Sequence, residues 1–157
     1  MKPRLLDLFC GAGGAAMGYH RAGFDVVGVD IKPQPRYPFE FIQADAMTFP
    51  LDGFDVIHAS PPCQRYSVAT VFHPGRQAEH PDLVDAMRAR LAATGSIYAI
   101  ENVPQAPLRN PLMLCGTMFR GLKVYRHRLF ECEPPVYFPP SYHNPHMFRP
   151  TEVGRRV

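Results

Sequence analysis

The residues best suited to chemistry in this chain form the segment SPPCQRYS at residues 60–67. It directly follows an apolar stretch, residues 54–59, with the composition of a buried strand. Two consecutive prolines cannot continue a strand or enter a helix interior, so the backbone must turn there. A thiol at the carboxyl end of a strand lies where α/β folds bind ligands. Cys63 is therefore a candidate nucleophile, and a buried, unreactive thiol is the simpler alternative.

A carboxylate, Glu101, follows another apolar stretch. Partial withdrawal from water would raise its pKa and let it share or donate a proton. Arg126 and Arg128 alternate within residues 124–130, so a strand there would direct both side chains to one side. Cations near Cys63 would favour its thiolate, which is the attacking form. The simpler alternatives are that Glu101 is a capping or loop carboxylate and that the two arginines form a solvated basic edge.

A glycine-rich turn, FCGAGG at residues 9–14, lies between a predicted strand and a predicted helix. Glycine permits positive φ and close approach of a ligand, although such turns also serve dinucleotides or are purely structural. Asp30 follows roughly 20 residues later, the spacing at which a carboxylate accepts ribose hydroxyls. Asp45, at the end of a third strand, could accept an adenine amino group. Together they outline an adenosine-sized pocket, and the lack of a lysine after the glycines argues against a triphosphate.

The elements that must position these residues alternate between strand and helix. Strands are predicted over residues 4–9, 26–29, 39–42, 54–59, 97–100 and 124–130, and helices over 15–22 and 82–93. This alternation indicates an α/β fold with a doubly wound, mostly parallel, Rossmann-like sheet. Because the polar candidates follow strand ends, they converge on one edge of that sheet.

Length and composition favour a single catalytic domain over residues 1–132, followed by a proline-rich extension over residues 133–157. No apolar run approaches the roughly 18 residues that span a membrane, and no signal peptide is recognisable. We therefore expect a cytoplasmic protein with no membrane partner. The spacing of the four cysteines matches no zinc signature, so we expect reduced thiols and no metal.

Positive charge is concentrated late in the chain. The formal net charge is +3, but residues 120–157 hold seven basic and three acidic residues. This balance permits a nucleic-acid partner without requiring one. His143 and His146 lie in this proline-rich part, where a surface tail is a simpler interpretation than a metal site.

Taken in chain order, four motifs resemble those of the DNA cytosine-5 methyltransferase family. The matching segments are DLFCGAGG at residues 7–14 with Gly18, PCQ at 62–64 with Ser67, ENV at 101–103, and RHR at 126–128. The resemblance covers roughly residues 4–131. Val124 stands where the family usually has glutamine, and Ile31 stands where tryptophan is frequent.

The resemblance implies a methyltransferase that uses S-adenosyl-L-methionine, releases S-adenosyl-L-homocysteine and acts on DNA. Cys63 would add to C6 of a flipped-out cytosine, Glu101 would contact N3, and C5 would take the methyl group. Arg126 and Arg128 would hold the base carbonyl and the backbone near Cys63, and residues 65–80 would close over the base. The implied cofactor contacts are Phe9, Gly11, Ala12, Gly13, Gly14, Asp30, Ile31, Asp45, Ala46 and Pro61. The implied substrate contacts are Pro62, Gln64, Ser67, Asn102 and Val103.

The chain departs from the family after the arginine motif. Longer members carry a target-recognition region and two further motifs, whereas about 27 residues follow Phe130 here. Three explanations are consistent with this: a short, phage-like form, a missing C-terminal segment, and dependence on a partner protein. The resemblance implies the cytoplasm of a prokaryotic or phage-infected cell. Alternative functions are an inactive cofactor-binding subunit and an RNA cytosine methyltransferase. A zinc deaminase is disfavoured because no second cysteine follows Cys63 at the required spacing.

Overall fold

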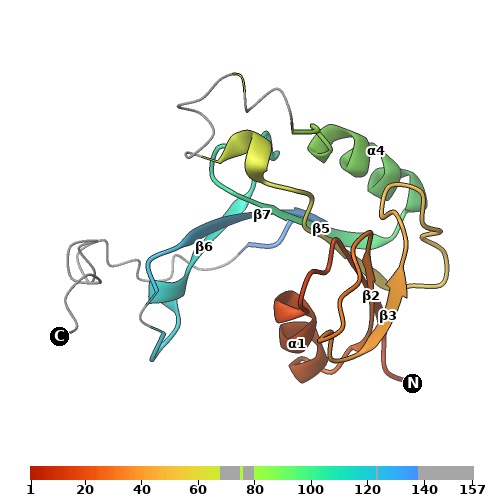
Figure 1. The fold of residues 1–157 in the computed structure, drawn as a ribbon. Coiled ribbons are helices and arrows are strands. Elements are labelled where there is room, and N and C mark those ends of the chain that lie inside the picture. Colours follow the sequence, from red (N-terminus) through yellow and green to blue (C-terminus); the bar gives the residue numbers. More distant parts are fainter. Residues whose placement is uncertain (68–74, 76–79, 123, 138–157) are drawn as a thin grey trace.

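The structure is a computed structural model that describes residues 1–67, 75, 80–122 and 124–137 (Figure 1). Its elements are β1 (Arg4–Leu8), α1 (Gly14–Arg21), β2 (Asp25–Asp30), β3 (Glu40–Gln43), β4 (Val56–Ala59), α4 (Val84–Thr94), β5 (Ile97–Asn102), β6 (Leu112–Cys115) and β7 (His127–Glu133). Short 3₁₀ turns span Gln64–Tyr66 and Gly116–Met118. No helix among the described residues has the length and apolar character needed to cross a membrane.

The strands form one seven-stranded sheet in the order β3-β2-β1-β4-β5-β7-β6. The first five strands in this order pair in parallel, while β7 is antiparallel to both β5 and β6. The strand order reverses between β1 and β4, which makes their carboxyl ends the expected ligand site. The predicted α/β class and mostly parallel sheet are confirmed.

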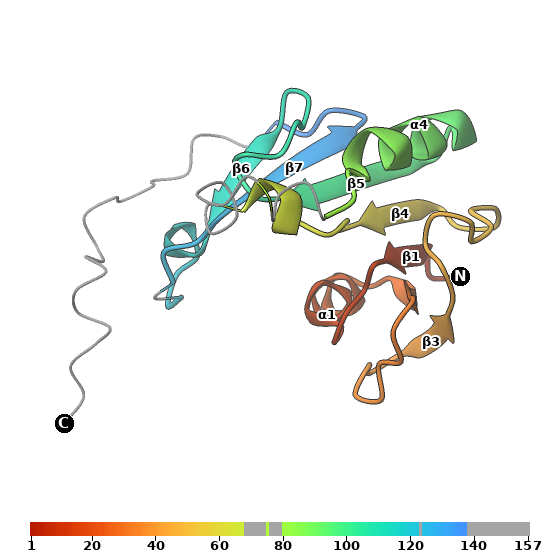
Figure 2. The same cartoon turned by 45° about the horizontal axis from the view of Figure 1, so that its top comes forward.

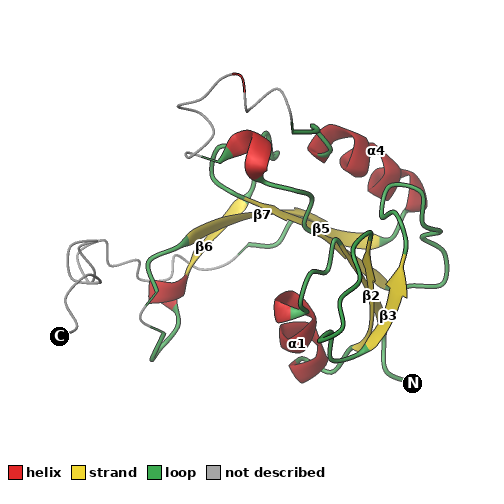
Figure 3. Ribbon diagram, viewed as in Figure 1, coloured by secondary structure: helices red, strands yellow, loops and turns green. Residues whose placement is uncertain are grey.

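Helices cover the two faces of the sheet (Figures 2 and 3). Leu5 and Val26 pack with Ala16 of α1 on one face. On the other face, alternate strand residues meet the apolar side of α4. The residues of this larger core include Leu6, Leu8, Val29, Ile57, Ile100, Met87 and Leu91. The period of two along strands and of three to four along α4 explains why both elements form.

Several element boundaries differ from those expected. β5 continues to Asn102, so Glu101 lies within the strand. β7 begins at His127 and not at residue 124, so Arg128 lies within the strand and Arg126 lies just before it. β6 has no counterpart among the predicted strands. The proposed closing segment falls mainly on residues 68–74 and 76–79, and most of the extension falls beyond Tyr137, which places both largely outside the described residues.

A buried carboxyl group lies in the middle of β1. Asp7 is fully buried, and the Tyr37 hydroxyl donates to its Oδ2 atom at 3.3 Å. Burial raises the pKa of Asp7 from 3.8 to about 7, the hydrogen bond from Tyr37 opposes the rise, and the charges of Asp30 and Glu101 add to it. Tyr37 is seated over Gly28, where a Cβ atom would collide with the tyrosine ring.

Replacement of Asp7 by asparagine is expected to make stability less sensitive to pH. Between about pH 4 and pH 7 the unfolded chain has lost this proton while the folded chain retains it, so wild-type stability falls as pH rises. The unfolding free energy of Asp7→Asn minus that of the wild type should therefore increase as pH rises through this window, by a few kcal/mol in order of magnitude. Above the window this difference should stay constant. Urea unfolding at several pH values measures the difference. The exposed Asp52→Asn variant is the control, and a pH-independent difference for Asp7→Asn would contradict the assignment.

Candidate active site

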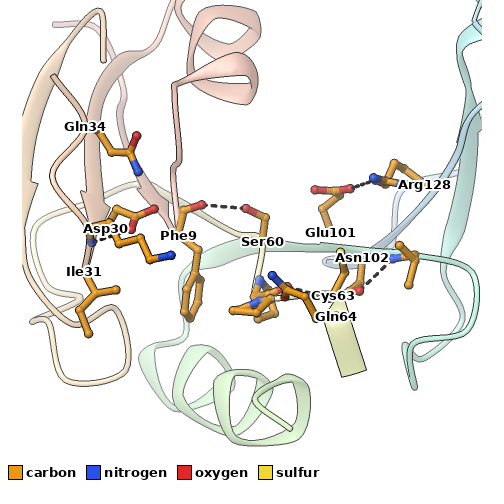
Figure 4. Close-up of a pocket in the computed structure, with 14 residues that line it drawn as sticks. Phe9, Asp30, Ile31, Gln34, Ser60, Cys63, Gln64, Glu101, Asn102 and Arg128 are labelled. Carbon is orange, nitrogen blue, oxygen red and sulfur yellow. Dashed lines mark hydrogen bonds and ion pairs between the residues drawn. The ribbon is translucent and has the colours of Figure 1, made fainter. Parts of the chain in front are cut away.

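A cavity of about 370 Å³ lies at the carboxyl ends of β1, β2, β4 and β5 (Figure 4). Its lining residues are Phe9, Asp30, Ile31, Lys32, Gln34, Ser60, Pro61, Pro62, Cys63, Gln64, Glu101, Asn102, Val103 and Arg128. Figure 4 shows Asp30, Ile31 and Gln34 at one end, Phe9 and Ser60 in the middle, and Cys63, Glu101 and Arg128 at the other. One continuous cavity therefore joins Asp30, the predicted ribose ligand, to the predicted nucleophile.

The glycine turn brings the backbone after β1 close to this cavity. Phe9 has a φ of 58°, and its carbonyl oxygen accepts a hydrogen bond from the Ser60 hydroxyl at 3.2 Å. Gly13 has a φ of 85°, and a Cβ atom there would lie 2.7 Å from the Pro38 ring. Both the positive φ and the close approach of Pro38 therefore require glycine at position 13.

Asp30 ends β2 with both of its carboxylate oxygens oriented by the backbone. The N–H of Gly11 donates to Oδ2 at 3.0 Å, and the N–H of Lys32 donates to Oδ1 at 2.9 Å. These bonds fix the carboxylate beside the glycine turn, and each oxygen retains a lone pair that can accept a ligand hydroxyl.

Cys63 precedes the 3₁₀ turn Gln64–Tyr66, and its carbonyl oxygen accepts from the N–H of Tyr66 at 3.0 Å. The buried Asn102 side chain of β5 donates to the carbonyl oxygen of Pro61 at 3.0 Å. Asn102 also accepts from the N–H of Val103 at 2.9 Å. The turn that carries the thiol is thus attached directly to the strand that carries Glu101.

A second set of contacts holds the far side of this turn. The Tyr66 hydroxyl donates to Asp82, and Arg65 Nε lies 3.3 Å from Asp82 Oδ2. Arg65 also donates to the carbonyl oxygen of His80 at 3.0 Å. Asp82 therefore anchors two of the three residues that follow Cys63.

Glu101 and Arg128 form an ion pair across β5 and β7, with 2.6 Å between Oε1 and Nε. Burial raises the pKa of Glu101, while the positive charges of Arg128 and Arg126 oppose the rise. The carboxyl group is thereby oriented, only partly solvated, and able to hold a proton more readily than an exposed glutamate. This arrangement suits a group that shares a proton with a ring nitrogen.

Several predicted contacts do not line this cavity, namely Gly11, Ala12, Gly13, Gly14, Asp45, Ala46, Ser67 and Arg126. Asp45 is exposed, and its Oδ1 atom accepts from the N–H of Met47 at 2.8 Å. The buried Ala46 offers its carbonyl oxygen to Arg90 at 2.7 Å. Asp45 and Ala46 thus serve a turn, and their contact to adenine stays a prediction.

Sequence reasoning also missed three lining residues. Lys32 and Gln34 belong to a stretch whose prolines predict only a loop, although its position directly after Asp30 was a usable signal. Ser60 belongs to the predicted proline turn, but its hydrogen bond to Phe9 could not be anticipated because the partner is 51 residues away.

Fold and site together define an α/β protein of the Rossmann-like class, with a thiol and an arginine-paired carboxyl group at its ligand edge. The chain belongs to the C-5 cytosine-specific DNA methylase family, whose family model matches residues 3–107. The Type II methyltransferase M1.HphI of Haemophilus parahaemolyticus is 35% identical over 41% of this chain. The chain spans 22% of that relative's length.

Solved structures match this chain at low identity. A hypothetical protein of Thermus thermophilus has a TM-score of 0.50 and 18% identity, covering 82% of this chain and 73% of that one. Magnesium protoporphyrin IX methyltransferase from Synechocystis PCC 6803 has a TM-score of 0.49 and 15% identity, covering 82% of this chain and 68% of that one.

Proposed function

We propose that this chain is a DNA cytosine-5 methyltransferase that uses S-adenosylmethionine and bonds Cys63 covalently to C6 of a flipped-out cytosine. The observation that carries the proposal is the shared cavity: Cys63, Glu101 and Arg128 line one end of it, and Phe9 and Asp30 line the rest. Membership of the methylase family supports the same chemistry.

The residues at the Asp30 end fit an adenosine-containing group. Asp30 offers carboxylate oxygens that accept ribose hydroxyls, and Phe9 offers an aromatic ring. S-adenosylmethionine, when bound, supplies a methyl group on a positively charged sulfur. Ile31 is 65% exposed and would provide a smaller apolar contact than an aromatic side chain.

At the other end, the chain's own groups activate the base. The Cys63 thiolate forms a bond to C6 as the C5–C6 double bond opens, which makes C5 electron-rich. Glu101 holds a proton at N3 and so stabilises the displaced charge, and Arg128 orients Glu101 through their ion pair. After C5 gains the methyl group, water takes the C5 proton and the electrons of that C–H bond re-form the C5–C6 double bond. The bond from sulfur to C6 breaks at the same time, and its electron pair returns to Cys63 as the thiolate. A base in a duplex must first leave the stack, at a cost of a few kcal/mol.

Target selection is proposed to need more than the described residues supply. The part of the chain that matches M1.HphI is a small fraction of that protein. A partner protein or a further C-terminal segment would then choose the sequence in which cytosine is modified.

Methyl transfer from labelled S-adenosylmethionine to duplex DNA, with transfer RNA in a parallel reaction, tests the function. We expect labelled 5-methylcytosine in DNA and none in RNA. DNA containing 5-fluorocytosine should become covalently attached at Cys63, since fluorine prevents loss of the substituent at C5. Transfer to RNA alone would favour the RNA enzyme, and cofactor binding without transfer or adduct would favour an inactive subunit.

Removal of the Asp30 carboxylate is expected to weaken cofactor binding selectively. Asp30→Ala should raise the dissociation constant for S-adenosylmethionine by about 10- to 100-fold, because a charged hydrogen bond contributes roughly 1.5–3 kcal/mol. Isothermal titration calorimetry measures the change. Asp52→Ala removes an exposed carboxylate elsewhere and should bind as the wild type does. Unchanged affinity in Asp30→Ala would remove Asp30 from the cofactor site.

A further inference from the structure

The described part of the loop between β6 and β7 (residues 116–122 and 124–126, the β6–β7 loop) presents large apolar side chains to solvent. Phe119 and Leu122 are each 51% exposed, Val124 is 45% exposed and Tyr125 is 44% exposed. Single exposed apolar residues are common, but four within seven positions form a patch of the kind found at binding sites.

The patch is held by a folded turn. The N–H of Phe119 donates to the Gly116 carbonyl at 3.1 Å, and the N–H of Leu122 donates to the Phe119 carbonyl at 3.0 Å. A Cβ atom at Gly116 would collide with the Val124 carbonyl oxygen, so the two sides of the loop are in close contact at its base. The backbone that carries Phe119 and Leu122 is therefore hydrogen-bonded within the loop, which reduces the backbone entropy lost on binding.

The charge around this patch favours a polyanionic partner. The loop segment, residues 116–126, includes three lysines and arginines and no aspartate or glutamate. Arg120 and Arg126, both within the loop, are exposed. A protein partner would be expected to meet charges of both signs, whereas a segment whose charged residues are all basic complements phosphates.

The loop also lies beside the cavity. Arg128, two residues beyond its end, pairs with Glu101 inside the site, and the charge of Arg126 acts on the same glutamate. Figures 1 and 2 show β6 and β7 carrying the loop outward, away from α1 and the β3 edge of the sheet. A duplex that delivers a base to Cys63 would extend across this side of the molecule.

We propose that the β6–β7 loop binds a groove of duplex DNA next to the target base, with Arg120 on phosphates and Phe119 and Leu122 against sugars and base edges. This inference rests on the proposed function. A two-stranded β-ribbon has the width that the major groove admits, and apolar side chains at its tip can contact the groove without a charge partner.

Fluorescence anisotropy with a short labelled duplex, over a series of salt concentrations, tests the inference. Arg120→Ala should weaken binding about 3- to 10-fold and reduce the slope of log affinity against log salt by about 1, because one phosphate contact is lost. Leu122→Ser should weaken binding without changing that slope. Arg21→Ala, which removes an exposed arginine from α1, is the matched control and should change neither quantity.

Wild-type affinity and slope in both loop variants would overturn the inference. It would also be overturned if Leu122→Ser bound DNA normally but lost a self-association that the wild type shows in sedimentation, because the patch would then be a protein interface. The assay requires no reaction, so its outcome is separate from that of the proposed function. Loop-dependent DNA binding without methyl transfer would contradict only the proposed methyltransferase activity. Normal methyl transfer by both loop variants would contradict only the proposed DNA contact of the loop.

Discussion

Replacement of Cys63 by serine is expected to lower methyl transfer by more than about a thousandfold, the scale on which removal of a nucleophile acts. A hydroxyl group is nearly the same size as a thiol but does not ionise near neutral pH, so it cannot supply the attacking anion. The effect should fall on the chemical step. Cys63 lies at the opposite end of the cavity from Asp30, so cofactor affinity should remain within a few-fold of the wild type.

The measurements are single-turnover transfer to DNA and covalent trapping by 5-fluorocytosine. Cys132→Ser is the matched control, because Cys132 is also a partly buried free thiol but does not line the cavity. It should retain transfer and trapping. Transfer by Cys63→Ser at a tenth of the wild-type rate or more would show that sulfur does not form the bond to the base.

Truncation of Arg88 to alanine is expected to destabilise the fold by about 3–5 kcal/mol, because it would leave a buried carboxylate without its partner. Arg88 is 5% exposed and Glu131 is 6% exposed. Two hydrogen bonds, of 2.6 and 2.9 Å, join the guanidinium to the carboxylate. Arg88 also donates to the Pro107 carbonyl at 2.7 Å, and the N–H of Arg109 donates to Glu131 at 2.7 Å. The pair thus connects α4, β7 and the chain before β6.

Urea unfolding of Arg88→Ala measures the loss, with Arg21→Ala expected within about 0.5 kcal/mol of the wild type. The double variant Arg88→Met/Glu131→Leu should be more stable than Arg88→Ala, because neither charge is then buried alone. A loss below about 1 kcal/mol in Arg88→Ala would mean that water reaches Glu131 and solvates it.

The sequence predicted the parallel part of the sheet and the residues at its edge. Apolar runs of four to six residues that lead into Asp30 and Cys63 are sufficient, because the carboxyl ends of parallel strands must meet. β6 was missed because it is a four-residue edge strand that only its antiparallel pairing with β7 defines. The true start of β7 at His127 depends on that same pairing.

The site was predicted only where local sequence determines it. Cys63, Glu101 and Asp30 follow from motif and strand position, and the structure places all three in one cavity. The positions of Asp45 and Arg126 depend on tertiary geometry: one closes a turn onto Met47, and the other precedes its strand. The Arg88–Glu131 pair spans 43 residues and has no local signature.

The hydrogen bond from Asn102 to Pro61 attaches the turn that carries Cys63 to the strand that carries Glu101. Asn102 is the immediate neighbour of Glu101, and Pro61 lies two residues before Cys63. A displacement of β5 would move both reacting groups together and leave their spacing intact. Loss of that single bond would let the two groups move independently of each other, because the contacts of Asp82 hold the turn only on its far side.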